Sequence, residues 1–175
     1  RVKQISALGH FTCAVTVRGE VWCWGQNYFH ELGDGTDVGR RTHPVRVVGL
    51  TRPVTDVSAG IAHSCALLDT GRVQCWGYGL LGDGTHRQSS TAVMVKGVDD
   101  AVDVAAGLVH SCLVRSDGSV WCWGYNRYGY LGDGTTRNRP TPVPIPGLSA
   151  GVSQVSTGWD RTCVVTVDGG VQCWG

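Results

Sequence analysis

Residues 111–124 read Ser-Cys-Leu-Val-Arg-Ser-Asp-Gly-Ser-Val-Trp-Cys-Trp-Gly, and this stretch decides the fold. The residues that flank Ser116-Asp117-Gly118 have the period-two patterning of short strands and no helical period. A three-residue loop with glycine in its third place is typical of a β-hairpin, because that place needs the left-handed backbone that glycine adopts at little cost. The stretch therefore predicts two antiparallel strands with Cys112 directly opposite Cys122.

The same hairpin occurs four times along the chain. Cys-Trp-Gly begins at Cys23, Cys75, Cys122 and Cys173, and a Leu-Gly-Asp-Gly-Thr segment follows the first three copies at Leu32, Leu81 and Leu131. The repeat units span approximately 1–50, 51–98, 99–148 and 149–175, the last being incomplete. We expect four short strands in a unit, as at 54–59, 64–68, 72–76 and 92–95. Four-stranded units with glycine-rich turns predict an all-β fold of antiparallel propeller blades, in a partial or open propeller.

Each hairpin brings two cysteines face to face. The pairs are Cys13 with Cys23, Cys65 with Cys75, Cys112 with Cys122, and Cys163 with Cys173. At such a non-hydrogen-bonded position the Cα atoms lie about 4.5 Å apart, within the range that a disulfide tolerates. Closing a loop of about 11 residues contributes about 3 kcal/mol in the chain-entropy model. The pairing predicts four disulfides and an oxidising compartment.

Reduced thiols and a metal site are the alternatives to disulfides. His63 and His110 each stand two residues before the first cysteine of their units, which places imidazole and sulfur on one strand face. Phe11 and Arg161 replace the histidine in the other two units, and no CxxC motif is present. The pattern therefore favours disulfides, and we expect no metal and no other cofactor.

The repeats resemble those of the regulator of chromosome condensation (RCC1-like) propeller family. The resemblance rests on residues 59–67, 117–126 and 129–135, whose motifs recur in order, and it extends over essentially the whole chain. It implies a seven-bladed propeller, so these four hairpins are either a fragment of a longer chain or a four-unit chain whose open faces are covered by copies of itself. The paired cysteines suggest a secreted bacterial type. The family's relatives include a secreted propeller that inhibits β-lactamases and nuclear members that act on a small GTPase and chromatin.

Composition narrows the classes of partner. The 175 residues contain 15 Lys and Arg against 14 Asp and Glu, a formal net charge of +1, without the basic excess that nucleic-acid binding usually needs. No apolar run is long enough to span a bilayer, and a leader peptide is not part of the sequence. With 26 glycines and 42% apolar residues, the chain is rich in turns and still able to bury a core.

Other motifs repeat at equivalent places, which is typical of structural residues. We interpret Asp34, Asp83 and Asp133 as turn residues that accept backbone hydrogen bonds, since a calcium loop needs more oxygen ligands than these segments carry. His63 and His110 are expected to tie a strand to a loop. No constellation of nucleophile, base and oxyanion donors is present, so we expect no catalytic residues and no enzyme.

Function is expected where the copies differ, on loops held by a rigid scaffold. Tyrosine, tryptophan and arginine dominate protein-binding hot spots. The partner-binding candidates are therefore Tyr28, Phe29, Tyr78, Arg127, Tyr128, Tyr130 and Trp159, although loop aromatics also pack onto the blade beneath them. Trp22 and Trp121, which Gln74 and Gln172 replace in other copies, are further candidates for a surface site. The sequence predicts an extracellular, cell-surface or periplasmic module that binds another protein on its loop face. The alternative is a structural protein that assembles with its own copies into a fibre or ring.

Overall fold

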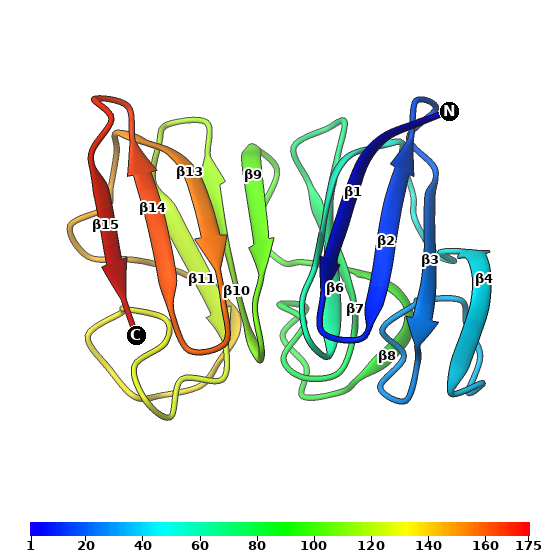
Figure 1. The fold of residues 1–175 in the computed structure, drawn as a ribbon. Helices are drawn as coiled ribbons and strands as arrows, with labels where there is room; N and C mark the ends of the chain where they lie inside the picture. Colours follow the sequence, from blue (N-terminus) through cyan, green and yellow to red (C-terminus); the bar gives the residue numbers. More distant parts are fainter.

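The computed structural model describes residues 1–175 and consists of fifteen strands without a helix (Figure 1). The structure therefore contains no helix that is long and apolar enough to cross a membrane. The strands are β1 (Val2–Leu8), β2 (Phe11–Thr16), β3 (Val21–Gln26), β4 (Arg40–Arg46), β5 (Val54–Ala59), β6 (His63–Leu68), β7 (Val73–Gly77), β8 (Ser89–Met94), β9 (Ala101–Ala106), β10 (His110–Arg115), β11 (Val120–Gly124), β12 (Arg139–Pro144), β13 (Val152–Thr157), β14 (Thr162–Thr166) and β15 (Val171–Trp174).

Consecutive strands pair antiparallel in four separate sheets. The first three sheets have four strands each, β1–β4, β5–β8 and β9–β12, and the fourth has three, β13–β15. The first strands of the sheets, β1, β5, β9 and β13, lie beside one another (Figure 1). The sheets are thus blades around a common axis, numbered 1 to 4 in chain order. The ring is open, which confirms the predicted fold class. Strand β8 begins at Ser89 rather than near residue 92, because Ser89 already pairs with Gly77.

The hairpin register puts the cysteines where the glycine-ended turns predict. Gly118 has a φ of +77°, the left-handed backbone that the three-residue turn requires. Each of the four cysteine pairs is joined by a disulfide with a Cα–Cα distance of 4.1 Å, slightly shorter than the expected spacing. The first three disulfides are buried, whereas Cys163 is half-buried and Cys173 is exposed. The disulfide thus lies on one particular face of each blade.

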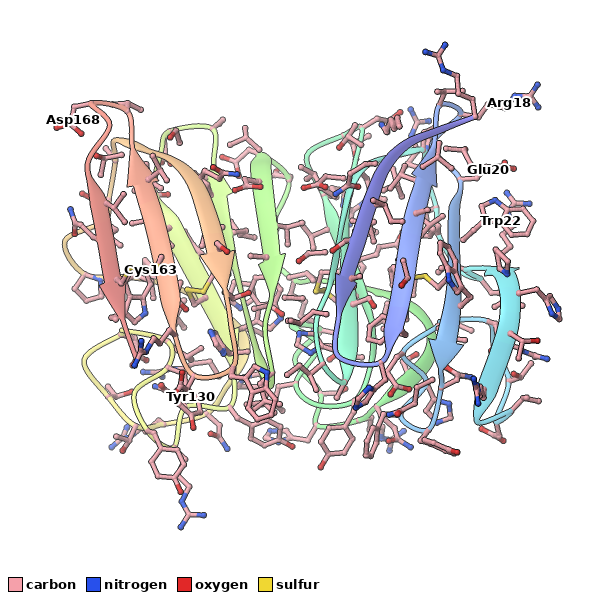
Figure 2. The ribbon with its side chains drawn as sticks, viewed as in Figure 1. Arg18, Glu20, Trp22, Tyr130, Cys163 and Asp168 are labelled. Carbon is pink, nitrogen blue, oxygen red and sulfur yellow. A yellow bond between two sulfur atoms is a disulfide. The ribbon has the colours of Figure 1, made fainter.

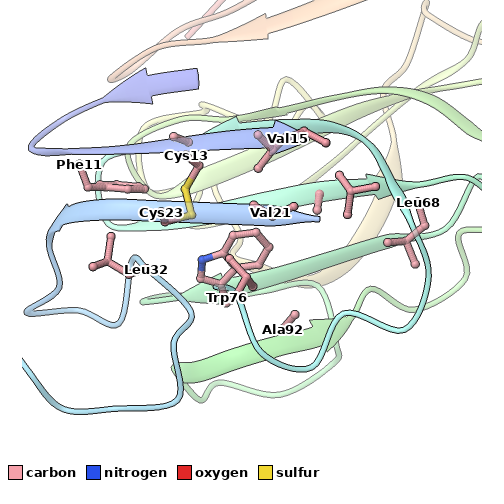
Figure 3. Packing of buried hydrophobic residues seen from close by; sticks show 14 residues of the cluster. Phe11, Cys13, Val15, Val21, Cys23, Leu32, Leu68, Trp76 and Ala92 are labelled. Carbon is pink, nitrogen blue, oxygen red and sulfur yellow. A yellow bond between two sulfur atoms is a disulfide. The ribbon is translucent and has the colours of Figure 1, made fainter. Parts of the chain in front are cut away.

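That face packs against the next blade. In the first interface, Cys13, Cys23 and Val21 of blade 1 contact a cluster from blade 2 that includes Trp76 and Leu68 (Figure 3). The same arrangement recurs between blades 2 and 3 and between blades 3 and 4. Each blade therefore buries its apolar face only by contact with its neighbour.

The tryptophan of Cys-Trp-Gly packs beneath the loop of the preceding blade. Trp76 and Trp123 are fully buried, while Trp24 and Trp174 are only partly buried. Gly33, with a φ of +63°, lies so close to Trp76 that a methyl group there would be 2.7 Å from the indole Cδ1. The Leu-Gly-Asp-Gly-Thr segment is thus a lid over the next blade's tryptophan, and its first glycine is required by this close approach.

The first strands of neighbouring blades are also joined by side-chain hydrogen bonds across the blade boundary. The Gln4 amide donates to the carbonyl of Val57 and accepts from the Val57 amide, both at 2.9 Å. Asp103 accepts a 2.7 Å bond from the Val155 amide, and Ser58 accepts from the Ala106 amide at 2.9 Å. These bonds satisfy edge groups of β5, β9 and β13, which no neighbouring strand pairs.

Gly33→Ala tests the lid. The new methyl group meets an indole that cannot move and also carries the cost of a positive φ, so we expect a loss of about 2–4 kcal/mol in the free energy of unfolding, measured in urea. Gly134→Ala is the matched control, because Gly134 has a φ of +75° with nothing within 4 Å, and its loss should stay near 1 kcal/mol. Equal losses in the two variants would contradict the lid.

Candidate functional site

The variable loops gather at one end of the molecule. The connections at 27–39, 78–88 and 125–138 follow the third strand of each blade and lie at the same end as the β13–β14 turn (Figure 1). Figure 2 shows Tyr130 at this end and Arg18 and Asp168, from the hairpin turns, at the opposite end. We call the first end the loop face.

Blades 1 and 3 hold their loops with the same set of polar contacts. The Asn27 side chain accepts from the Leu32 amide at 3.0 Å, and Asn126 accepts from the Leu131 amide at the same distance. Arg41 pairs with Asp34, and Arg139 pairs with Asp133, each at 2.7 Å. Sequence reasoning predicted the turn hydrogen bonds of the aspartates but missed these ion pairs.

The loop aspartates are kept ionised by their partners. Burial alone would raise the pKa of Asp34, but hydrogen bonds from Thr36 and Arg41 and the positive charge of Arg41 hold that pKa below its usual range. Asp133 is held low in the same way by Thr135 and Arg139. The two loops are therefore fixed by charge-assisted contacts that stay intact at neutral pH.

Blade 2 lacks the asparagine contact and the arginine ion pair. Gly79 stands at the place of Asn27, and Ser89, which pairs with Gly77, stands at the place of Arg41, which pairs with Gly25. Asp83 consequently bonds only to Thr85, at 2.8–2.9 Å. The blade 2 loop is also three residues shorter between the Cys-Trp-Gly and Leu-Gly-Asp-Gly-Thr motifs. It is thus the one loop of the three whose shared fastening has been lost.

Contacts from each loop to the next blade also differ. The Glu31 carbonyl in the first loop accepts hydrogen bonds from Trp76 Nε1 at 2.8 Å and from the Ser64 hydroxyl at 3.2 Å. In the third loop, the Thr162 hydroxyl donates to the Tyr130 carbonyl at 3.4 Å. Trp123 Nε1 beneath the second loop and Trp174 Nε1 beneath the third are both buried without a hydrogen-bond partner. The second loop reaches blade 3 through the Gly84 amide, which donates to the Pro140 carbonyl at 2.9 Å. Of the three loops, only the first therefore holds the tryptophan of the next blade by a hydrogen bond.

The structure brings the aromatic candidates of the loop face into two groups. The Phe29 and Tyr78 rings of adjacent blades lie 5.4 Å apart between centroids. Tyr128 lies 5.6 Å from Tyr130, and the Arg127 guanidinium covers the Tyr128 ring at 5.5 Å. Tyr128 is 66% exposed, Phe29 44% and Tyr78 41%, so these rings face solvent despite their mutual contacts. Large exposed rings held in place are typical of binding surfaces.

Other candidates do not join these groups. Tyr28 packs on Gly39 of its own loop, and Trp159 is exposed in the β13–β14 turn. Trp121 is half-buried beneath the Arg115 guanidinium, 5.0 Å from it, on the face of a blade. Trp22 is likewise half-buried on β3, so these two candidates lie on strands and not on the loops.

The buried histidines join blades rather than a strand and a loop. His63 Nε2 lies 2.7 Å from the Ser111 hydroxyl, and His110 Nε2 lies 2.9 Å from the Thr162 hydroxyl, in each case on the following blade. This corrects the expected strand-to-loop bond. Burial lowers the pKa of both imidazoles to about 4, so both are neutral at neutral pH. No group of three or more His, Cys, Asp or Glu side chains is placed to hold a metal ion.

Sequence reasoning missed three residues of the loop face. Tyr125 neighbours Tyr78, and burial together with Tyr78 raises the pKa of its phenol. His86 and Arg87 line a hollow with these two tyrosines. The signal was present in the shortened second loop, whose departures from the repeat mark it as different from its neighbours.

A stack of antiparallel blades that share one core pattern and differ in their loops defines the class of repeat β-propellers. Two models, each described as a regulator of chromosome condensation (RCC1) repeat, match this chain, one at residues 18–67 and 117–165 and the other at 2–31, 54–84 and 101–129. The chain belongs to the RCC1 repeat family.

Its relatives include larger proteins. The chain is 33% identical over 182 residues to the ultraviolet-B receptor UVR8 of Arabidopsis thaliana, covering 100% of this chain and 41% of that protein. It is 35% identical over 102 residues to the human E3 ubiquitin-protein ligase HERC2, covering 56% of this chain and 2% of that protein. The chain thus spans less than half the length of these relatives.

Solved structures show the same fold. Prp20p of Saccharomyces cerevisiae superposes with a TM-score of 0.85 at 23% identity, covering 99% of this chain and 44% of that one. Human WBSCR16 superposes with a TM-score of 0.84 at 24% identity, covering 94% of this chain and 44% of that one.

The two buried histidines predict a specific acid sensitivity. Each folded-state pKa of about 4 lies below the ordinary 6.5, so each neutral imidazole contributes stability that is present above pH 6.5 and is lost as the pH falls toward 4. The loss approaches about 3 kcal/mol for each histidine. His63→Gln should therefore flatten the fall in unfolding free energy between pH 7 and 4, measured by urea titration at each pH, while the exposed control His86→Gln keeps it. A wild-type slope in His63→Gln would contradict this assignment.

Proposed function

We propose that this chain is an extracellular protein-binding module that holds its partner on the loop face. The observation that carries the proposal is the pair of exposed aromatic groups, Phe29 with Tyr78 and Arg127 with Tyr128 and Tyr130, on loops that differ between copies of one repeat. The framework beneath them does not differ in this way. Variation confined to the loops of a constant scaffold is typical of recognition surfaces.

Pre-organisation favours binding by these rings. Tyrosine and phenylalanine have few rotatable bonds, and here each ring is further held by a neighbouring ring or guanidinium. A partner would therefore immobilise little that is not already fixed, which lowers the entropic cost of association. The near balance of 15 basic and 14 acidic residues argues for a protein partner rather than nucleic acid.

Proteins with this fold are described in complexes with proteins. Prp20p, the yeast RCC1, is described in one solved structure by its binding to Gsp1p and histones, and in another it is bound to Kap60. This one protein is 23% identical to the chain, so it supports protein binding as a use of the fold and does not indicate the identity of a partner.

The extracellular location is supported by the four disulfides and the absence of any free cysteine. Disulfides persist where the surroundings are oxidising. Mass measurement on protein from its natural source tests the extracellular location, and eight free thiols in that sample would contradict this location.

Alanine substitution on the two ends of the molecule tests the binding face. Once a partner has been isolated from the extracellular fraction, Tyr78→Ala and Tyr128→Ala should each raise the dissociation constant at least tenfold, as the loss of a hot-spot ring does. Val167→Ala is the control, because Val167 is 74% exposed and lies at the opposite end. Calorimetry measures all three. Loss of binding in Val167→Ala alone would place the binding site at the hairpin end and contradict binding on the loop face.

Self-association is a second candidate function, favoured by the outer blade faces. Ile5 is 63% exposed, whereas the equivalent Val57 of blade 2 is 1% exposed. At the other end of the stack, Val171 is 66% exposed, whereas the equivalent Val21 is fully buried. If copies cover these faces, sedimentation should show particles that grow with concentration, and Ile5→Lys should abolish them. A constant monomer mass at high concentration would remove this candidate.

A further inference from the structure

The blade 2 loop leaves a hollow where the other two loops are fastened. The hollow has a volume of about 450 Å³ and is lined by Tyr78, Gly79, His86, Arg87, Gln88 and Tyr125. Gly79 stands where blades 1 and 3 carry the asparagine that fastens their loops, so the missing side chain helps to open it. In a repeat protein, a copy that gives up shared structural contacts has that position free for another use.

The hollow is lined by hydrogen-bond donors without an anionic partner. Arg87 is exposed and forms no ion pair with any carboxylate of the chain. His86 is exposed beside it, and the Gln88 amide reaches only the His30 ring, at 3.4 Å. The carboxylate of this loop, Asp83, is bound to Thr85 and does not line the hollow. An unpaired guanidinium with imidazole and amide beside it suits a planar carboxylate.

The walls of the hollow are aromatic and firmly placed. The Tyr78 amide donates to the Ala62 carbonyl at 2.8 Å, and the Tyr125 amide donates to the Val109 carbonyl at 3.0 Å. The Tyr78 ring is further supported by Phe29. In blade 1, Gln26 occupies the equivalent position, with its amide bonded to the His10 carbonyl at 3.0 Å. Two tyrosines on adjacent blades thus stand on a rigid base and line the hollow with aromatic side chains.

We propose that this hollow, the blade 2 notch, receives an acidic side chain of a protein partner together with an aromatic residue next to it. Arg87 pairs with the carboxylate, His86 lines the same hollow and shares in its recognition, and the ring of the neighbouring residue packs on Tyr78 and Tyr125. The inference rests on the proposed function, since it names the chemistry that the loop face recognises. It places the central contact on blade 2, the blade whose loop departs from the repeat.

Blade 3 supplies a matched control within the same chain. Arg137 is the equivalent of Arg87, because each donates its amide to a threonine hydroxyl two residues earlier, Arg137 to Thr135 at 3.2 Å and Arg87 to Thr85 at 3.3 Å. Arg137 is also exposed, but its loop is closed by Asn126 and by the pair of Arg139 with Asp133. A general attraction of anions to arginine would act on both residues, whereas the notch involves only Arg87.

Nuclear magnetic resonance titration tests the notch without a natural partner. The probes are acetyl-Trp-Glu-amide, acetyl-Trp-Gln-amide and inorganic phosphate, added to the full chain at constant ionic strength. We expect the glutamate probe to shift the amide signals of Tyr78, Gly79 and Gln88 in a saturable way and to bind at least fivefold more tightly than the glutamine probe. Arg87→Gln should remove that preference, and Arg137→Gln should retain it.

Three results would overturn the notch. These are an absence of saturable shifts at 20 mM glutamate probe, equal binding of the glutamate and glutamine probes, and tighter binding of phosphate than of the glutamate probe, which would make the notch a phosphate site. None of these would affect the alanine test of the loop face with an isolated partner. Conversely, glutamate binding at Arg87 in a protein whose partner ignores Tyr78→Ala and Tyr128→Ala would reject the proposed function and leave the notch in place.

Discussion

The structure depends on the contact between the disulfide face of one blade and the tryptophan face of the next. Between two four-stranded blades this contact is fully buried, as for the Cys13–Cys23 disulfide against Trp76. Where the contact is missing, equivalent residues are exposed, as for Val171 at 66% against Val73 at 0%. A single blade therefore has a sheet without a core, and the hydrophobic contribution to folding arises between blades. The disulfides act on a different term, since they restrict each hairpin in the unfolded chain.

This division explains why the loops can differ. The core contacts come from strands whose register is fixed by the hairpins, so a loop can lose its asparagine and its ion pair without disturbing Cys65 or Cys75 beneath it. Blade 2 illustrates this. Its strands bury their apolar residues as completely as those of blades 1 and 3, although its loop has lost the fastening that the other two share. A loop can thus vary without a change in the strands beneath it, which is a property that a binding module needs.

The sequence predicted contacts within a hairpin better than contacts between blades. The glycine-ended turns fixed the facing cysteines, because the pairing of two strands follows from the residues that separate them. The bonds of His63 and His110 to the following blade were missed, as was the partial burial of Trp121 beneath Arg115. Strand periodicity shows that a residue lies on one face, but it does not show which neighbouring element covers that face. The Arg41–Asp34 pair was also missed, since its partners are seven residues apart across an irregular loop.

His110 shows how far the loop face depends on the interface below it. Its Nε2 atom meets the Thr162 hydroxyl across the blade boundary, and its ring stacks at 5.8 Å on Tyr130 of the loop. Thr162 in turn donates to the Tyr130 carbonyl, so backbone and side chain of this loop residue are both fixed from the blade boundary. Tyr130 then supports Tyr128, which is the more exposed ring. The orientation of an exposed aromatic side chain is therefore set two contacts away, by a neutral imidazole between blades, and a change in blade packing would alter the loop face without touching it.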